Sequence, residues 1–264
     1  MICVGNGASG IDIATQIMSC CKWPLLMSQR SESFLLPEPS PSKDERPEIV
    51  EFIAEDRAVR FADGSVESDI DSVLFCTGYF YSFPFLEDLK PALIGDGTHV
   101  QNLYQHLFYR PNPTLAFPVL QQRVIPFPMA EVQAAVLARV WSGRLNLPSD
   151  REMKAWEDEV YAETGGERQF HLLKFPKDAD YINAMHDFAM SAEEGEGEGA
   201  KKVKGKTPPR WGAREYWLRE RFASVKKAFQ ERGEGRHQVR TVEELGFDYD
   251  EFVEEKRRET KGLI

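Results

Sequence analysis

The sequence has few cysteines and histidines, and their spacing matches none of the common redox or metal motifs. The four cysteines include an adjacent pair but no CxxC, and the five histidines form no HxxxH or HExxH pattern. This spacing predicts neither a disulfide framework nor a zinc site. The missing CxxC also argues against a dithiol reductase. We therefore expect a reducing, cytoplasmic setting and no bound metal.

The chain also lacks an excess of basic residues. It carries 33 lysines and arginines against 43 aspartates and glutamates, which gives a formal net charge of −10. A protein that binds nucleic acid usually needs a basic surface, because it must displace counterions from phosphate. The charge balance therefore argues against nucleic acid as a partner.

Long apolar runs are missing as well. No segment approaches the roughly 18–20 consecutive apolar residues that span a bilayer, and the first residues lack the basic-then-apolar pattern of a secretion signal. Apolar residues nevertheless make up 42% of the chain, which is enough to build a core. We expect a folded protein without a transmembrane segment.

Charged residues are distributed unevenly along the chain. Of the first 150 residues 29 are charged, against 47 of the last 114. This difference predicts a core-rich first part and polar surface helices in the second. Within the second part, the glycine-rich stretch near 191–209 changes from acidic to basic and predicts a flexible loop.

Hydrophobic periodicity and turn residues predict the main elements. Strands are expected over 2–4, 24–28, 49–53, 58–61 and 72–75, and helices over 8–21, 129–141, 152–164 and 211–232. Asp63-Gly64 is expected to form a hairpin turn between two of the strands. Gly143 is expected to close the helix before it.

The first ten residues contain a GxGxxG pattern directly after an apolar strand and directly before an amphipathic helix. In such a unit the first glycine makes the tight turn, the second lets a pyrophosphate approach the backbone, and the third lets the helix pack closely on the strand. The free N–H groups and positive dipole end of the helix then face the pyrophosphate. The pattern predicts a dinucleotide site formed by Gly5, Asn6, Gly7, Ala8, Ser9 and Gly10.

The end of the second strand indicates which dinucleotide binds. NAD sites usually carry an acid there, about 20 residues on, which bonds the ribose 2′-hydroxyl. Here the strand ends in Ser28-Gln29-Arg30, without an acid. A guanidinium binds a 2′-phosphate with a forked pair of hydrogen bonds. We therefore expect NADPH rather than NADH or FAD, with Ser28 and Arg30 in contact; the alternative is that Arg30 is an ordinary solvated loop residue.

The same residues carry a resemblance to the flavin-containing monooxygenases, which include the N,N-dimethylaniline monooxygenases. VGNGASGIDIA at Val4–Ala14 resembles their NADPH-binding glycine motif, and Ser28–Arg30 is similar to the tip of their second strand. FCTGY at Phe75–Tyr79 resembles their ATGY motif, with Cys76 in place of alanine. The pieces NLYQHLF, PTLAF and VIPFPMAEVQAAVLARVWSGRLNLPS, within 102–149, are similar in order and spacing.

The resemblance covers about residues 2–150 and implies an α/β fold. A Rossmann-like NADPH-binding domain is followed by the C-terminal part of a flavin-binding domain and by charged helices. The implied domains are 1–78, 79–150 and 151–264. Thr77, Gly78 and Tyr79 join the cofactor-binding candidates, and His106 is expected to have a structural role.

The resemblance also implies an activity. Such an enzyme uses NADPH, FAD and O₂ to oxygenate a soft nitrogen or sulfur nucleophile on a small molecule. The family's FAD-binding glycine motif is missing here, so the chain is expected to be shortened; no catalytic residue is assigned, and an oligomer is possible. Two alternatives stay open: a truncated, non-catalytic NADPH-binding protein, and a flavin-free NADP-dependent reductase.

Overall fold

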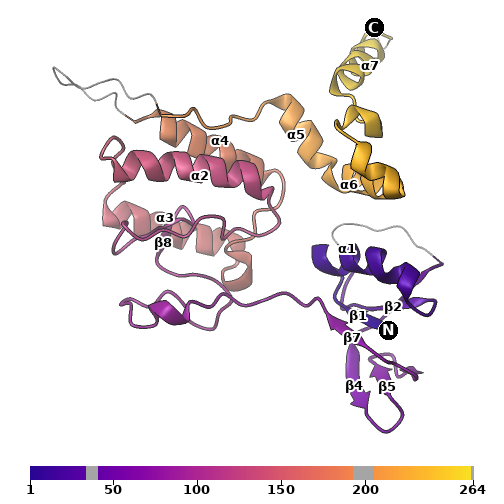
Figure 1. Ribbon diagram of the computed structural model, residues 1–264. Coiled ribbons are helices and arrows are strands. Elements are labelled where there is room, and N and C mark those ends of the chain that lie inside the picture. The colour runs from indigo at the N-terminus through magenta and orange to yellow at the C-terminus, as the bar shows by residue number, and fades with distance from the viewer. Residues whose placement is uncertain (34–40, 193–204, 263–264) are drawn as a thin grey trace, which may run out of the picture. The chain divides into compact units, whose positions relative to one another are not determined.

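The computed structural model describes residues 1–33, 41–192 and 205–262, and its chain forms two compact units (Figure 1). Unit 1 comprises Met1–Tyr79 and unit 2 comprises Phe80–Ile264. The division falls directly after the TGY segment, and the predicted three-part division of the chain stays a prediction.

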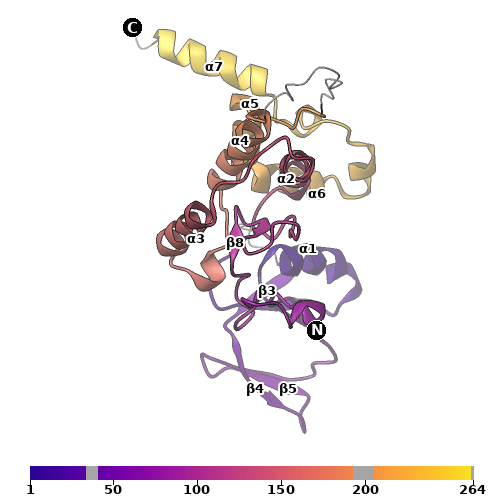
Figure 2. The same cartoon turned by 90° about the vertical axis from the view of Figure 1, so that its left-hand side faces the viewer.

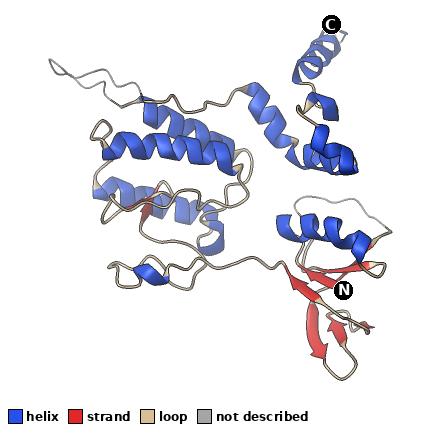
Figure 3. Ribbon diagram, viewed as in Figure 1, coloured by secondary structure: helices blue, strands red, loops and turns tan. Residues whose placement is uncertain are grey.

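A four-stranded parallel sheet forms the centre of unit 1, with the strand order β3-β2-β1-β7. Helix α1 (Ala8–Ile17) follows β1 and leads back to β2. This is the arrangement of a Rossmann-like unit, and Figure 3 shows its strands beside α1. The sheet consists of β1 (Ile2–Val4), β2 (Leu25–Ser28), β3 (Lys43–Arg46) and β7 (Val73–Phe75).

A second, antiparallel sheet covers the face of the parallel sheet that lies opposite α1 (Figure 2). Successive side chains of a strand point to opposite faces, so Cys3 packs on the α1 side, whereas Ile2 packs against Val59 and Phe61 of the second sheet. Because both of its faces are covered, β2 is apolar at three successive positions. The second sheet consists of β4 (Ile49–Ile53), β5 (Ala58–Phe61) and β6 (Val66–Glu67).

The predicted hairpin turn at Asp63-Gly64 is confirmed, with Gly64 at φ +86°. The turn joins β5 to β6, a two-residue strand that the sequence did not predict, so the expectation that it joins two of the predicted strands is wrong. Residues 66–67 escaped prediction because two residues show no alternation.

Unit 2 begins with a loop-rich segment around a small apolar core. Its core residues include Leu93, Val100, Leu103, Tyr109 and Phe117. Short elements occur along this segment: the 3-10 turn η2 (Pro84–Leu86) and the paired strands β8 (Leu103–Tyr104) and β9 (Phe108–Tyr109).

The larger core of unit 2 lies among helices. Met129, Val132 and Val136 of α2 recur at helical spacing and are fully buried, and the helix packs on α4. The predicted left-handed Gly143 closes α2, with φ +73°. The elements are α2 (Pro126–Trp141), α3 (Asp150–Thr164), the turn η3 (Glu167–Gln169) and α4 (Lys177–Met190).

Helix α3 carries a complete capping box. The Ser149 hydroxyl accepts a hydrogen bond from the Glu152 N–H, and the Glu152 carboxylate accepts one from the Ser149 N–H. These bonds satisfy donors that the first turn leaves unpaired.

The C-terminal region contains three helices that bury few side chains. The expected helix over 211–232 is interrupted at Arg221, and Arg219 of α5 forms an ion pair of 2.6 Å with the buried Asp178 of α4. The Arg221 guanidinium lies 4.7 Å from the ring centre of Trp217 and 5.1 Å from that of Phe252. The elements are α5 (Ala213–Glu220), α6 (Phe222–Glu231), η4 (Gly233–Gln238), η5 (Glu243–Leu245) and α7 (Tyr249–Gly262).

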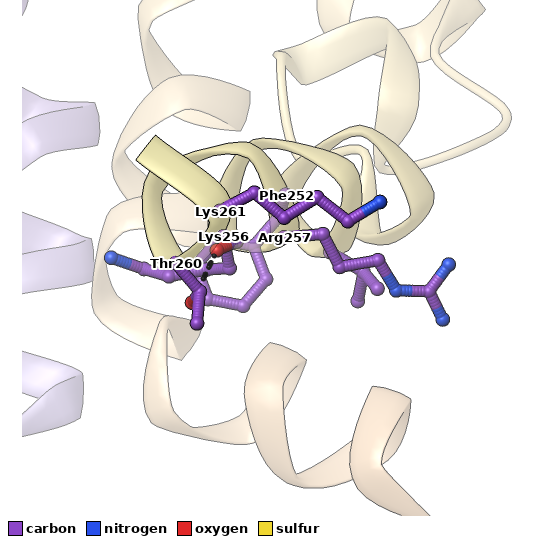
Figure 4. Close-up of a pocket in the computed structure, with 6 residues that line it drawn as sticks. Phe252, Lys256, Arg257, Thr260 and Lys261 are labelled. Carbon is purple, nitrogen blue, oxygen red and sulfur yellow. Dashed lines mark hydrogen bonds between the residues drawn. The ribbon is translucent and has the colours of Figure 1, made fainter. Parts of the chain in front are cut away.

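A hollow of about 380 Å³ lies along α7, where Phe252, Lys256 and Thr260 line it (Figure 4). Among the described residues, no helix is long and apolar enough to cross a membrane. The loop expected near 191–209 falls mostly on residues 193–204, which lie outside the described part of the chain.

Candidate functional site

Two of the three glycines in the opening turn are required by the packing of unit 1 itself. Gly5 has φ +103°, and a Cβ there would lie 2.5 Å from the Cys76 carbonyl oxygen. A Cβ on Gly10 would overlap the Gly5 carbonyl oxygen. The predicted tight turn and close helix packing are therefore both present.

Gly7 is different, because no neighbouring atom requires a glycine there. A Cβ on Gly7 would have nothing within 4 Å, and its φ of −74° is accessible to any residue. The space above Gly7 is open, which is the room that a pyrophosphate needs to reach the backbone.

The start of α1 faces this open space with N–H groups for which the described residues provide no acceptor. The first intrahelical hydrogen bond runs from the Ile11 N–H to the Gly7 carbonyl, 3.0 Å away. The N–H groups of Ala8, Ser9 and Gly10 precede it and have no acceptor within the helix. The first turn contains no acidic residue, so the positive end of the helix dipole is not neutralised there. The residues present fit the pyrophosphate of a dinucleotide.

Asn6 fixes the turn to the end of β2. Its side-chain amide donates hydrogen bonds to the Gln29 side-chain oxygen at 2.8 Å and to the Ser31 carbonyl at 2.5 Å. The Ser33 hydroxyl donates to the Asn6 carbonyl at 2.7 Å. The Asn6 side chain therefore has partners within the protein, and its direct effect is on the shape of the site.

The end of β2 contains Ser28 and Arg30, which behave differently. Ser28 is buried, and its hydroxyl donates to the Pro47 carbonyl at 3.0 Å. The Arg30 side chain is 85% exposed and forms an ion pair with Glu48, whose Oε2 lies 2.7 Å from the Arg30 Nε. Of these two residues, Arg30 is the one exposed to solvent and able to contact a 2′-phosphate, and it already has an acidic partner.

Glu48 is a residue of this site that the sequence reasoning missed. It follows β3, a strand of sequence KDER that has no apolar alternation and was not predicted. Since β3 pairs in parallel with β2, with Ser28 opposite Arg46, the residues that follow both strands lie at the same edge of the sheet. The pairing of β3 with β2 is what brings Glu48 to this edge, and sequence periodicity does not contain that pairing.

The TGY segment lies at the same edge. Cys76 continues β7, and its N–H donates to the Val4 carbonyl at 2.7 Å. Thr77, Gly78 and Tyr79 follow and are exposed, with Gly78 at φ +85°. The chain leaves β1 toward β2 while β7 pairs on its other side, so β1 marks the point where the strand order reverses. Ligands of open α/β sheets bind at such a point, beyond the carboxyl ends of the strands.

The Cys3 thiol beneath the turn carries no charge at neutral pH. The sulfur atoms of Cys3 and Cys76 lie 3.8 Å apart. Burial, together with the neighbouring Cys76, raises the pKa of the Cys3 thiol to about 12. Cys3 is therefore a packing residue under the sheet edge.

In unit 2 the titratable side chains that stand out are two buried histidines. The Val100 N–H donates to the Nε2 of His171 at 3.0 Å, so this nitrogen is an acceptor and the Nδ1 of His171 carries the proton. That Nδ1 lies 3.1 Å from the Nδ1 of His106. Burial lowers the pKa of His106 to about 3 and that of His171 to about 2. Both rings are neutral and pack among aromatic side chains, which confirms the structural role expected for His106.

A polar hollow of about 350 Å³ lies in unit 2 between the residues around β8 and helix α3. Its charged side chains pair with one another: Arg110 contacts Glu157 at 3.8 Å, and Lys154 contacts Asp158 at 2.6 Å. Burial raises the pKa of Glu157. In the part of the chain that the structure describes, no group of three histidine, cysteine, aspartate or glutamate side chains is arranged to hold a metal.

Comparisons with known proteins agree on one family. The model of the family described as flavin-binding monooxygenase-like matches residues 43–194, more than half of the chain. The thiol-specific monooxygenase of Saccharomyces cerevisiae is 34% identical over 59% of this chain and 38% of its own length. The flavin-containing monooxygenase FMO GS-OX-like 2 of Arabidopsis thaliana is 34% identical over 71% of this chain and 41% of its own length. The chain thus spans about two fifths of the length of these relatives.

Solved structures show the same fold. The S-allyl-L-cysteine S-oxygenase of Allium sativum matches with a TM-score of 0.66 at 24% identity, over 100% of this chain and 54% of that protein. Tmm of Pelagibacter sp. strain HTCC7211 matches with a TM-score of 0.63 at 19% identity, over 86% of this chain and 46% of that protein. The α/β class expected from the sequence is confirmed.

Proposed function

Because the chain belongs to the flavin-binding monooxygenase-like family, we propose that its unit 1 binds NADPH for the oxygenation of a soft sulfur or nitrogen nucleophile by O₂. The observation that carries the proposal is the opening turn: a glycine with open space above it, at a helix start whose first N–H groups have no acceptor in the described part of the chain. The names of the relatives, a thiol-specific monooxygenase among them, favour sulfur in the substrate.

The turn binds the pyrophosphate through the backbone. The N–H groups of Ala8, Ser9 and Gly10 donate to its oxygens, and Gly7 lets those oxygens come close. Asn6 keeps the turn in shape through its bonds to the end of β2. These residues bind and orient the cofactor and need no change of protonation to do so.

The two ends of the site distinguish the two halves of the cofactor. At the end of β2, the Arg30 guanidinium bonds the 2′-phosphate of the adenosine half, while Ser28 supports this tip from beneath. At the end of β7, Thr77 and Gly78 leave room for the ligand to approach the backbone, and Tyr79 offers an exposed ring. Thr77, Gly78 and Tyr79 would hold the nicotinamide half, which supplies the reducing equivalents when bound.

The family implies a flavin, which when bound supplies the oxygen chemistry. The sequence contains one GxGxxG turn, and we assign that turn to NADPH binding. We therefore assign no residue of this chain to FAD and no catalytic residue. Residues 79–150 are proposed as the returning segment of the flavin domain and 151–264 as a charged helical region, in a cytoplasmic protein that acts on a small molecule.

The test combines a measurement of NADPH binding with a measurement of flavin absorbance. The purified full chain is titrated with NADPH by calorimetry, and its visible spectrum is recorded before and after FAD is added. The proposal predicts NADPH affinity. Flavin absorbance that stays with the protein, together with NADPH-dependent uptake of O₂ with a thiol or tertiary amine, would show that the chain also holds FAD and is active by itself. A colourless chain that binds NADPH is a non-catalytic NADPH-binding protein. NADPH oxidation that needs a carbonyl compound and no flavin identifies a reductase, and no NADPH affinity overturns the proposal.

A further inference from the structure

We propose that Glu48 is a specificity-determining residue of the NADPH site, which restrains the preference for NADPH over NADH. The inference rests on the proposed function, because it concerns the partner of Arg30 at the end of β2. The juxtaposition that carries it is the ion pair of 2.7 Å between the Arg30 Nε and the Glu48 carboxylate.

The fold delivers Glu48 to this position through fixed contacts of the backbone. The Ser28 hydroxyl donates to the Pro47 carbonyl at 3.0 Å, and the Gln29 N–H donates to the Arg46 carbonyl at 2.9 Å. Both bonds hold the residues just before Glu48 against the end of β2. Glu48 thus occupies the sheet edge where a dinucleotide site of the NAD type has its acid, although it comes from a different strand.

The carboxylate acts on a 2′-phosphate in two ways. First, the carboxylate occupies one side of the Arg30 guanidinium, and a phosphate needs that side to form a forked pair of hydrogen bonds. Second, the negative charge of the carboxylate repels the phosphate. For NADH both effects are absent, since a 2′-hydroxyl is neutral and can donate a hydrogen bond to a carboxylate. Removing the charge of Glu48 therefore favours NADPH selectively.

Two other acids near the tip have partners of their own. Glu45 accepts a hydrogen bond from the Gln29 side-chain amide at 2.8 Å, and Asp44 pairs with Arg46 at 2.7 Å. Glu48, 45% exposed, is the acid paired with Arg30. An exposed ion pair has a modest energy, so we expect a change in affinity of about two- to fivefold.

The chain offers a matched control. Glu51 of β4 forms an exposed ion pair with Arg60 at 2.8 Å. Glu51→Gln removes the same charge from the same unit as Glu48→Gln but acts on a different arginine. A difference between the two variants therefore reports on the Arg30 pair and not on net charge.

The experiment measures the dissociation constants of the full chain and of both variants for NADPH and for NADH, at low and at high salt. We expect Glu48→Gln to tighten NADPH about two- to fivefold, to leave NADH unchanged or weaker, and to lose most of this gain at high salt. Glu51→Gln should leave the ratio of the two constants unchanged, and the unfolding temperatures of both variants confirm that they fold.

The possible failures are distinguishable. If the unmutated chain has no affinity for NADPH, the proposed function is overturned, and this inference with it. If the chain binds NADPH and Glu48→Gln leaves the NADPH to NADH ratio unchanged, or shifts it only as far as Glu51→Gln does, the inference alone is overturned.

Discussion

The two units hold their notable polar groups in opposite ways. Unit 1 presents backbone N–H groups, a glycine and an exposed arginine at one edge of a small sheet. Unit 2 encloses two histidines in an aromatic core, where they meet each other and the backbone. Groups that a ligand must reach stay at the surface, whereas groups that stabilise the fold are buried with their partners inside the protein. The comparison predicts that changes in unit 2 alter stability and changes at the edge of unit 1 alter binding.

The largest effect expected is an acid-dependent loss of stability in unit 2. Unfolded histidines take up protons below a pKa of about 6.5, whereas burial holds the pKa of His106 at about 3 and that of His171 at about 2. Their contribution is complete above pH 6.5 and decreases as the pH falls toward 3. The free energy of unfolding should fall by up to about 2.7 kcal/mol per pH unit for two such groups.

Hydrogen exchange at the Val100 amide, which bonds His171, measures this loss locally. His106→Gln should reduce the pH slope by about half, because one of the two titrating groups is gone. His237→Gln, at a side chain that is 69% exposed, should keep the slope. An opening free energy that stays constant from pH 7 to pH 4.5, after correction for intrinsic exchange, would contradict the account.

In unit 1 the largest effect is expected from Gly10→Ala. The new Cβ overlaps the Gly5 carbonyl oxygen, which is backbone and has little freedom to move. We expect a loss of about 3 kcal/mol of stability, together with loss of NADPH binding. Hydrogen exchange of the sheet amides, recorded as the temperature is raised, measures this loss of stability. Exchange in the α2–α4 core should not change. A sheet as stable as that of the unmutated chain would refute the packing role of Gly10.

Arg30→Ala should affect the cofactor and not the fold. The side chain is largely exposed, so unfolding should be unaffected. The loss of a charged hydrogen bond to the 2′-phosphate should weaken NADPH by about 1.5–3 kcal/mol and leave NADH nearly unchanged. Calorimetric titration with both cofactors decides the matter, and equal losses would mean that Arg30 does not contact the phosphate.

Gly7→Ala gives the smallest of the four effects and separates binding from folding most cleanly. A Cβ there meets no atom of the protein, so stability should stay within about 1 kcal/mol of the original. The methyl group lies in the space proposed for the pyrophosphate, and NADPH should bind about tenfold more weakly, or by about 1.4 kcal/mol. Unchanged affinity would place the pyrophosphate elsewhere.

The same contrast explains what could be predicted from the sequence. The turn of unit 1 is local: strand, glycines and helix start lie within ten residues, and each glycine has a physical reason that spacing alone reveals. The His106–His171 pair and the Arg30–Glu48 pair join positions 65 and 18 residues apart. Such contacts depend on tertiary packing and strand pairing, which a single sequence does not display.

Some elements were missed for other reasons. In α4 the buried Ala179, Ile182 and Met185 recur every three residues, so this helix does have an apolar periodicity in the sequence. In α7 the residues are mostly charged, and the apolar side chains Tyr249, Phe252 and Val253 all lie in its first five residues. No glycine or proline lies at Arg221, so the sequence does not indicate that the helix is interrupted there. The Arg221 guanidinium stacks on Trp217 and Phe252 at this break.

The central claim is that the backbone at the start of α1 binds NADPH. Amide resonances of the isotope-labelled full chain, recorded by NMR during titration with NADPH, test it most directly. The account predicts large shifts for the N–H groups of Ala8, Ser9 and Gly10, with a smaller response at Arg30 and none in the α2–α4 core. Shifts confined to unit 2, or no shifts at the opening turn when NADPH is saturating, would contradict it.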